Sequence, residues 1–214
     1  MKTLKIDFVS DVACPWCAIG LNSLERALER VRPDHIEAEL HFQPFELNPT
    51  LSPDGADTVQ YLAGKYGIGP EQIARNQAAI RTRGAEVGFA FGRRARVWNT
   101  FDAHRLLHWA GLHGKQRELK HALLKAYHGE GRNPGAHDVL LDLAGAAGLD
   151  IEAAREVLAS GRYADEVRAA EAKWQQAGIH SVPSVIVNDR HLIQGGQPPE
   201  VFEQALRQIA AAEA

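Results

Sequence analysis

Two cysteines three positions apart, Cys14 and Cys17, are the only cysteines in this chain of 214 residues. They begin and end a Cys-Pro-Trp-Cys motif. An alternating apolar run over 4–9 predicts a half-buried strand before the motif, and apolar residues at helical spacing over 18–31 predict a helix after it. The N-terminus of a helix stabilises an anion, and the thiolate is the reactive form of cysteine. We therefore predict that Cys14 is the nucleophile and that Cys17 resolves the mixed disulfide.

Two other uses of a cysteine pair are less consistent with the sequence. A disulfide that closes so short a loop constrains the unfolded chain very little, which favours a redox site over a structural crosslink. A zinc site needs further ligands, and no second cysteine pair is present. His104 and His108 are four positions apart, but no third ligand shares their helical face. We expect no metal and no bound cofactor, only a redox-active disulfide between Cys14 and Cys17.

The composition is that of a globular protein with one domain or two compact lobes, with 45% hydrophobic and 24% charged residues. A net charge of -3 predicts no nucleic-acid surface. A local group of arginines could bind an anion or could form ordinary surface ion pairs; its members are Arg81, Arg83, Arg93, Arg94 and Arg96. No apolar run is long enough to span a bilayer. We expect a cytoplasmic protein without membrane contacts, either a monomer or a homodimer, although a chain with its signal removed would look the same.

The motif must be positioned by the elements around it. Alternation over 36–42 predicts a second strand, and prolines in 43–49 predict a loop. From about residue 57 to residue 178 the spacing is helical, with glycines at helix ends. A hairpin with its turn at 188–190 follows. The predicted helices cover 58–66, 70–87, 100–113, 115–128, 136–147, 151–159, 163–177 and 199–211, and the late strands cover 181–187 and 191–193.

Four motifs in this order resemble the DsbA family of thioredoxin-fold proteins, and within it the FrnE-like branch. They are SDVACPWC at 10–17, PFELNP at 44–49, NTFDAHRLL at 99–107, and the pair Val182-Pro183. The helical stretch before the late hairpin is longer than ordinary connections and also looks like the DsbA family. The resemblance covers essentially the whole chain.

The resemblance implies an α/β protein: a thioredoxin-like fold with a large inserted all-helical domain. Residues 1–50 and 162–214 would form the thioredoxin-like domain, and residues 51–161 the inserted domain. It also implies a cis Pro183 beside Cys14, which would leave the backbone of Val182 free to pair with an extended substrate. A trans proline at the start of a strand is the alternative.

The implied catalytic residues are thus Cys14, Cys17 and Pro183. The residues implied in substrate binding are Pro15, Trp16, Phe45, His104, Val182, Gly196 and Gln197. The aromatic residues Trp16, Phe45 and Trp98 would form an apolar wall, with core packing as the alternative.

Three further positions have alternative interpretations. The helix of His104 looks like the one that roofs the active site in this family, although a packed or solvated histidine is the other interpretation. Residues 195–197 would close the groove opposite Pro183, where glycine permits close backbone approach. Asp11 could tune the thiolate or relay a proton, but an exposed turn aspartate is the default expectation.

The chain also departs from the family pattern. Ala18 stands where FrnE-like proteins often have an aromatic residue, and Ser181 stands where glycine commonly precedes Val-Pro, so the shape of the substrate is open. Trp16 stands where DsbA has histidine. Without an imidazolium near the thiolate, Cys14 should be less acidic and the disulfide less oxidising than that of DsbA.

The predicted function is therefore a thiol–disulfide oxidoreductase acting on protein or small disulfide substrates, with glutathione as reductant or co-substrate. The alternative is a glutathione-dependent isomerase or transferase of the kappa or chromene-carboxylate isomerase type. Those relatives typically carry serine at the position of Cys14, so the intact pair argues against this alternative. A third hypothesis is a chaperone-like binding groove in which the cysteines are incidental.

Overall fold

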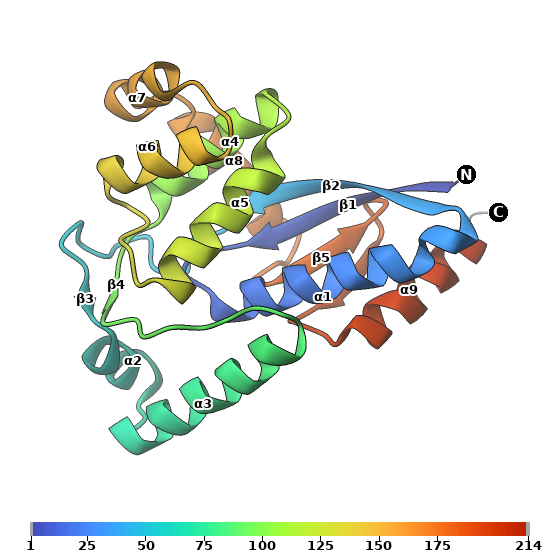
Figure 1. Ribbon diagram of the computed structural model, residues 1–214, viewed down its shortest axis with the longest axis horizontal. Coiled ribbons are helices and arrows are strands. Elements are labelled where there is room, and N and C mark those ends of the chain that lie inside the picture. The colour runs from blue at the N-terminus through green and yellow to red at the C-terminus, as the bar shows by residue number, and fades with distance from the viewer. Residues whose placement is uncertain (1, 213–214) are drawn as a thin grey trace.

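The computed structural model describes residues 2–212. A mixed four-stranded sheet with the order β2-β1-β5-β6 lies at its centre (Figure 1). β1 (Lys2–Ser10) and β2 (Ile36–Pro44) are parallel, whereas β5 (Ser184–Val187) and β6 (His191–Gln194) form a hairpin that pairs antiparallel with β1. Because β1 and β2 are parallel, their carboxyl ends lie next to each other. The cysteine motif follows the carboxyl end of β1.

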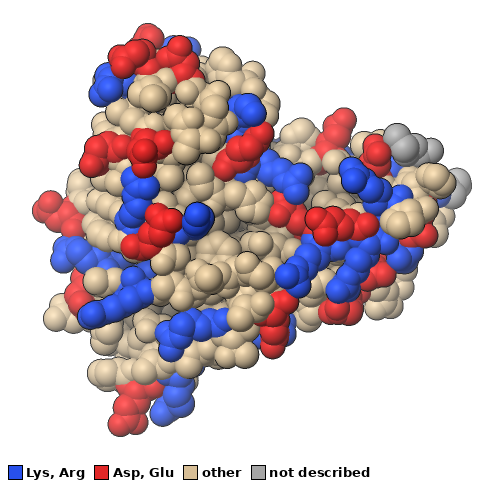
Figure 2. Space-filling view, viewed as in Figure 1, with Lys and Arg blue, Asp and Glu red and all other residues tan. Residues whose placement is uncertain are grey.

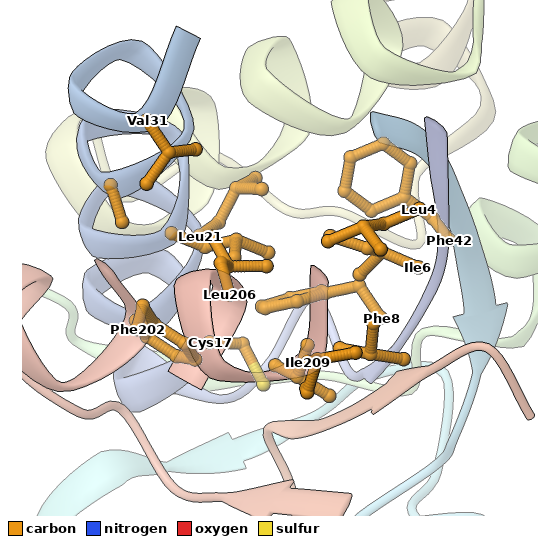
Figure 3. Close-up of a cluster of buried hydrophobic side chains, with 14 of the residues drawn as sticks. Leu4, Ile6, Phe8, Cys17, Leu21, Val31, Phe42, Phe202, Leu206 and Ile209 are labelled. Carbon is orange, nitrogen blue, oxygen red and sulfur yellow. The ribbon is translucent and has the colours of Figure 1, made fainter. Parts of the chain in front are cut away.

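Alternation along β1 sends its side chains to two different layers. Leu4, Ile6 and Phe8 are fully or almost fully buried and share one hydrophobic cluster with side chains of α1 (Pro15–Val31) and α9 (Pro199–Ala212). These two helices lie side by side on one face of the sheet (Figure 1). Figure 3 shows the interior of this layer, into which the side chain of Cys17 points.

The opposite face of the sheet is covered by α8 (Ala164–Gln176), which contacts β2. Val9, Trp174 and Ile186 belong to the cluster between them. The central sheet is therefore buried on both sides, as expected for an α/β protein.

The helical region between β2 and β5 has a core of its own, formed by α4 to α7 together with Val12 and Ala13 from the approach to the motif. This order of elements confirms the predicted α/β arrangement with a large helical insertion. Besides α8, the α-helices of this region are α2 (Thr58–Tyr66), α3 (Pro70–Glu86), α4 (Phe101–Leu112), α5 (Gln116–Leu124), α6 (His137–Ala146) and α7 (Ile151–Ser160). A short pair of strands, β3 (Ala56–Asp57) and β4 (Arg96–Val97), was not predicted.

Most predicted boundaries lie within one or two residues of the observed ones, and three differences are informative. The second strand continues to Pro44, because β2 is an edge strand and a proline there need not donate to a neighbour. One helix was predicted over 115–128. In the structure α5 ends at Leu124, and a π-helical turn (Lys125–Gly129) follows it. The late strand begins at Ser184, after the Val182–Pro183 bond.

The surface carries both signs of charge. On the face seen in Figure 2, basic and acidic side chains are interspersed. Among residues 2–212, no helix is both long and apolar enough to cross a bilayer.

Candidate active site

Cys14 is the N-cap residue of α1 and lies directly before its first helical residue. Its backbone is extended (φ -88°, ψ 116°), and Pro15 occupies the first helical position, where a missing N–H costs no hydrogen bond. The amide of Cys14 donates to the carbonyl of Asp11 at 3.2 Å, and the amide of Cys17 donates to the carbonyl of Cys14 at 3.1 Å. The predicted strand-to-helix junction is therefore present, with both cysteines in the first turn.

The two sulfurs have different surroundings. Cys14 is 5% exposed and lines a cleft, whereas Cys17 is fully buried among the side chains of the α1–α9 layer (Figure 3). A hydrogen bond from the Cys17 thiol lowers the pKa of Cys14, together with backbone N–H groups of the helix start. Burial raises the pKa of Cys17 well above its usual value, and the adjacent Cys14 sulfur raises it further. The geometry thus favours a thiolate on Cys14.

Pro183 lies across from the motif. The Val182–Pro183 peptide bond is cis, and the carbonyl oxygen of Val182 is 3.6 Å from the Cys14 sulfur. A Cβ added at Gly20 of α1 would come within 3.0 Å of the Pro183 ring. Glycine at position 20, which the sequence analysis did not single out, is therefore what lets α1 approach Pro183.

The loop after β6 returns to the same place. The amide of Gly195 donates to the carbonyl of Pro183 at 2.8 Å. A Cβ at Gly196 would lie 2.9 Å from the carbonyl oxygen of Trp16, so this position needs glycine for close approach. The side chain of Gln197 donates to the carbonyl of Gln194 at 2.8 Å, so it braces its own loop.

Asp11 is fully buried, so the default expectation of an exposed turn aspartate is wrong. Its Oδ1 accepts hydrogen bonds from the Ala13 amide at 3.0 Å and from the Thr100 hydroxyl at 2.7 Å, and lies 3.3 Å from His104 Nε2. Its Oδ2 accepts from the Leu47 amide at 2.7 Å. Asp11 therefore joins the motif to the loop after β2 and to the start of α4.

The carboxylate of Asp11 stays ionised in this setting. Burial alone would raise the pKa of Asp11, but the hydrogen bond and charge of His104, together with the amides of Leu47 and Ala13, hold it below its usual value. The negative charge of Asp11 in turn raises the pKa of Cys14 and partly opposes the hydrogen bond from Cys17. His104 is buried behind Asp11 and does not line the cleft at Cys14, which corrects the prediction of a substrate-binding residue there.

Two further buried bases near the motif were missed by the sequence analysis. Lys120 of α5 is 1% exposed and, with His104, lines a separate cavity of about 290 Å³ on the side of β2. His128 of the π-helical turn is fully buried and its Nε2 lies 2.8 Å from the carbonyl oxygen of Val12. The inserted region thus places a buried lysine and a buried histidine near the cysteine motif.

The cleft at Cys14 has a volume of about 700 Å³. Pro15, Trp16 and Val182 line it together with Cys14, and α2 and α3 contribute further lining residues. We call it the Cys14 cleft. Phe45 and Trp98 do not line it: Phe45 packs in the cluster beneath α8, and Trp98 packs against Tyr127, so the predicted wall of aromatic residues is wrong at these two positions.

Comparisons with known proteins identify the family and the fold of the chain. The family model for the DSBA-like thioredoxin domain matches residues 5–207. The crystal structure of the probable DsbA oxidoreductase SCO1869 from Streptomyces coelicolor is 36% identical, with a TM-score of 0.91 and coverage of 99% of this chain and 91% of that chain.

Two other proteins are more distant in sequence. YwbO of Bacillus subtilis (strain 168) is 29% identical over 205 residues, which are 95% of this chain and 96% of YwbO. The cytosolic disulfide reductase DsbM from Pseudomonas aeruginosa, solved with GSH, is 19% identical with a TM-score of 0.63, and the match covers 95% of this chain and 98% of that chain. At that identity, DsbM shows a shared fold.

Proposed function

Because this chain belongs to the family of DSBA-like thioredoxin domains, whose members are thiol oxidoreductases, we propose that it cycles Cys14 and Cys17 between dithiol and disulfide. Cys14 is the nucleophile, Cys17 the resolving cysteine, and Pro183 the residue that presents the neighbouring backbone to the substrate. The substrates are disulfides or thiols of proteins or small molecules. Within the family, the motifs at 10–17 and 99–107 favour the FrnE-like branch.

The reaction is a pair of thiol–disulfide exchanges. The Cys14 thiolate attacks one sulfur of the substrate disulfide and releases the other as a thiolate, which takes up a proton. Cys17 then loses its proton and attacks the Cys14 sulfur of the mixed disulfide, which releases the second substrate thiol. Two electrons pass from the dithiol to the substrate, and the Cys14–Cys17 disulfide forms. The reverse sequence oxidises a dithiol substrate. Substrate disulfides are rearranged when a second substrate thiol, in place of Cys17, attacks the mixed disulfide and releases the Cys14 thiolate.

The different setting of the two sulfurs is the observation that carries the proposal. Cys14 lies on the cleft with a lowered pKa, and Cys17 is enclosed with a raised pKa. A substrate can therefore reach Cys14 but not Cys17. Since an attacking thiol must be both ionised and accessible, this asymmetry gives each cysteine one role.

The surroundings of the reaction are part of the proposal. We propose that the protein acts in the cytoplasm, as DsbM is described to do, with glutathione as reductant or co-substrate. In that compartment the thiol pool is reducing.

We also propose that residues 51–161 act as the inserted domain that shapes the substrate site, while residues 1–50 and 162–214 carry the redox centre.

The test is a redox titration of the Cys14/Cys17 pair against glutathione or dithiothreitol buffers, combined with insulin reduction. We expect a reversible two-electron couple, less oxidising than the roughly -120 mV of DsbA because Trp16 replaces an imidazolium. Cys14→Ser should abolish activity. A pair that does not cycle, or a Cys14→Ser variant that stays active, would contradict the dithiol mechanism.

Cys17→Ser separates this proposal from the glutathione-dependent isomerase alternative. In a dithiol mechanism the variant traps a mixed disulfide on Cys14 and stops turning over, because no second thiol resolves it. An isomerase or transferase that needs one group at position 14 would keep its activity. Turnover of the variant with glutathione as reductant separates the two mechanisms, and mass spectrometry identifies the mixed disulfide on Cys14.

A further inference from the structure

The Cys14 cleft extends well beyond the reacting sulfur. Its lining from α2, α3 and β4 includes the apolar side chains of Leu62, Ile73, Ile80 and Val97. Its volume of about 700 Å³ lies within the range of sites that bind small molecules. An apolar body attached to a substrate sulfur would therefore find room beside Cys14.

Apart from the Cys14 thiolate, the charged side chains that line the cleft are the cations Lys65 and Arg94. Lys65 and Arg94 line it together with His180, and none of its lining residues in the described chain is acidic. The nearest acid behind the motif, Asp11, is fully buried and takes up hydrogen bonds from its own neighbours.

Among residues 2–212 the two cations donate hydrogen bonds only to neutral groups, although the charges of Asp11 and Cys14 also attract Lys65. Lys65 Nζ donates to the Leu47 carbonyl at 2.9 Å and to Asn48 Oδ1 at 2.8 Å. Arg94 donates to the Tyr127 hydroxyl at 3.3 Å, and its guanidinium lies 5.2 Å from the centre of that ring. Their positive charge is therefore available to an anionic ligand that enters the cleft.

We propose that the Cys14 cleft binds a low-molecular-weight disulfide that carries a carboxylate and an apolar or aromatic body. The carboxylate lies toward Lys65 and Arg94, the apolar body lies against the α2 and α3 side chains, and one sulfur meets Cys14. This inference rests on the proposed function and names its substrate class. An extended polypeptide is the competing occupant.

The step is the exchange described above. The Cys14 thiolate forms a bond to one sulfur as the substrate S–S bond breaks, and the first carboxylated thiolate leaves. Cys17 then displaces the second from Cys14, so one disulfide is reduced to two thiols while the dithiol becomes a disulfide. The cations contribute by binding the carboxylate, and they take no part in electron transfer.

The test compares two aromatic disulfides of similar size, the anionic dithiobis(nitrobenzoate) and the uncharged dithiodipyridine, as oxidants of the reduced protein. Lys65→Met and Arg94→Met should each slow the reaction with the anionic disulfide about fivefold or more and the uncharged one less than about twofold. Arg75→Met is the matched control, since this exposed arginine of α3 does not line the cleft. It should change neither rate by more than about twofold.

The unmodified protein provides a second measurement that does not depend on how the variants fold. Added sodium chloride should lower its preference for the anionic disulfide, because salt screens attraction. With free dithiothreitol, whose thiolate repels the anionic disulfide, salt should raise the same preference. If salt has the same effect in both cases, or if Lys65→Met slows both disulfides equally, the carboxylate site is ruled out.

These outcomes are distinct from a failure of the proposed function. A protein that cycles reversibly but does not discriminate between the two disulfides keeps the dithiol mechanism and loses the carboxylate site. A parallel loss of insulin reduction in Lys65→Met and Arg94→Met would assign the cleft to polypeptides and overturn the proposal. If Cys14→Ser reacts as fast as the unmodified protein, the dithiol mechanism itself fails.

Discussion

Thr100 donates a hydrogen bond of 2.7 Å to Asp11 beneath the cysteine motif, although 89 positions separate the two residues. The bond ties the start of α4 to the turn that leads into α1. It also stabilises the negative charge of the Asp11 carboxylate, which is fully buried. The inserted helical region therefore helps to set the electrostatics of the redox centre, in addition to forming the wall of its cleft.

Asp11→Asn should make the disulfide more oxidising. The charge of Asp11 raises the pKa of Cys14, so its removal stabilises the thiolate and with it the reduced protein. A change of about 1.4 kcal/mol corresponds to roughly 30 mV for this couple. The measurements are the Cys14 pKa, from the ultraviolet absorbance of the thiolate, and the redox titration.

Thr100→Val is the control for Asp11→Asn. It removes one hydrogen bond and leaves the charge in place, so it should cost about 1 kcal/mol of unfolding free energy and shift the potential less. If Asp11→Asn leaves the potential unchanged or makes it more reducing, the electrostatic account of Asp11 is wrong.

Lys120→Met should slow the second exchange more than the first, because the charge of Lys120 acts more strongly on Cys17 than on Cys14. The positive charge of Lys120 lowers the pKa of Cys17, whereas burial and Cys14 raise it. Without this charge a smaller fraction of Cys17 is ionised, so release of the second thiol from the mixed disulfide should slow about threefold to tenfold. Single-turnover kinetics separate the two steps, and the pH profile of the second should move upward.

Lys125→Met is the comparison for Lys120→Met. Lys125 follows α5 directly, and its side chain is 77% exposed. It should leave both exchange rates unchanged. Equal slowing of both steps in Lys120→Met would indicate a general structural defect and would refute a specific effect on Cys17.

Gly196→Ala should disturb the active site, whereas Gly64→Ala should stabilise the protein. A methyl group at 196 would lie 2.9 Å from the Trp16 carbonyl oxygen and 3.5 Å from the Gly20 amide, and overpacking of this kind costs about 1–3 kcal/mol. At Gly64 in α2 an added Cβ meets nothing within 4 Å, and alanine is favoured in a helix by up to about 1 kcal/mol. Chemical denaturation and insulin reduction measure both. Unchanged activity in Gly196→Ala would show that the loop can move away from the motif.

Much of the fold was predictable because its elements carry local periodicity. Leu4, Ile6 and Phe8 alternate, and α1 repeats its apolar residues every three or four positions, so the strand–motif–helix unit could be recognised from residue types alone. The π-helical turn after α5 was missed because its residues continue the helical spacing. What ends α5 is the packing of Tyr127 and His128 into the interior.

The candidate site was predictable where chemistry is local and not where it depends on distant partners. Asp11 pairs with Leu47, Thr100 and His104, each far away in the sequence, so no local pattern distinguishes it from an exposed turn aspartate. Lys120 did leave a signal, because it shares the helical face of the buried residues Leu119, Leu123 and Leu124. For Phe45 and Trp98, aromatic character alone could not distinguish a substrate wall from a core.

Acid should destabilise the protein through His128. Burial lowers the pKa of His128 well below its ordinary value of 6.5, and the charges of Arg94 and Lys120 lower it further. The Val12 carbonyl and the charge of Asp11 act in the opposite direction but do not outweigh these effects. Between the folded pKa and 6.5 the unfolded chain therefore binds more protons than the folded protein. The unfolding free energy should fall as pH falls below 6.5, by up to about 1.4 kcal/mol per pH unit from this group.

His128→Gln should remove this dependence, since a glutamine amide can donate to the Val12 carbonyl without titrating. Within residues 2–212 the Nδ1 atom of His128 has no hydrogen-bond partner, so a proton added there finds no acceptor. The exposed His113, at the end of α4, provides the matched control as His113→Gln. Urea denaturation between about pH 5 and 7.5 measures the slope. The lowered Asp11 pKa acts in a separate window below 3.8, because its contribution to stability is lost only as that carboxylate protonates. An unchanged slope in His128→Gln would show that other groups cause the acid sensitivity.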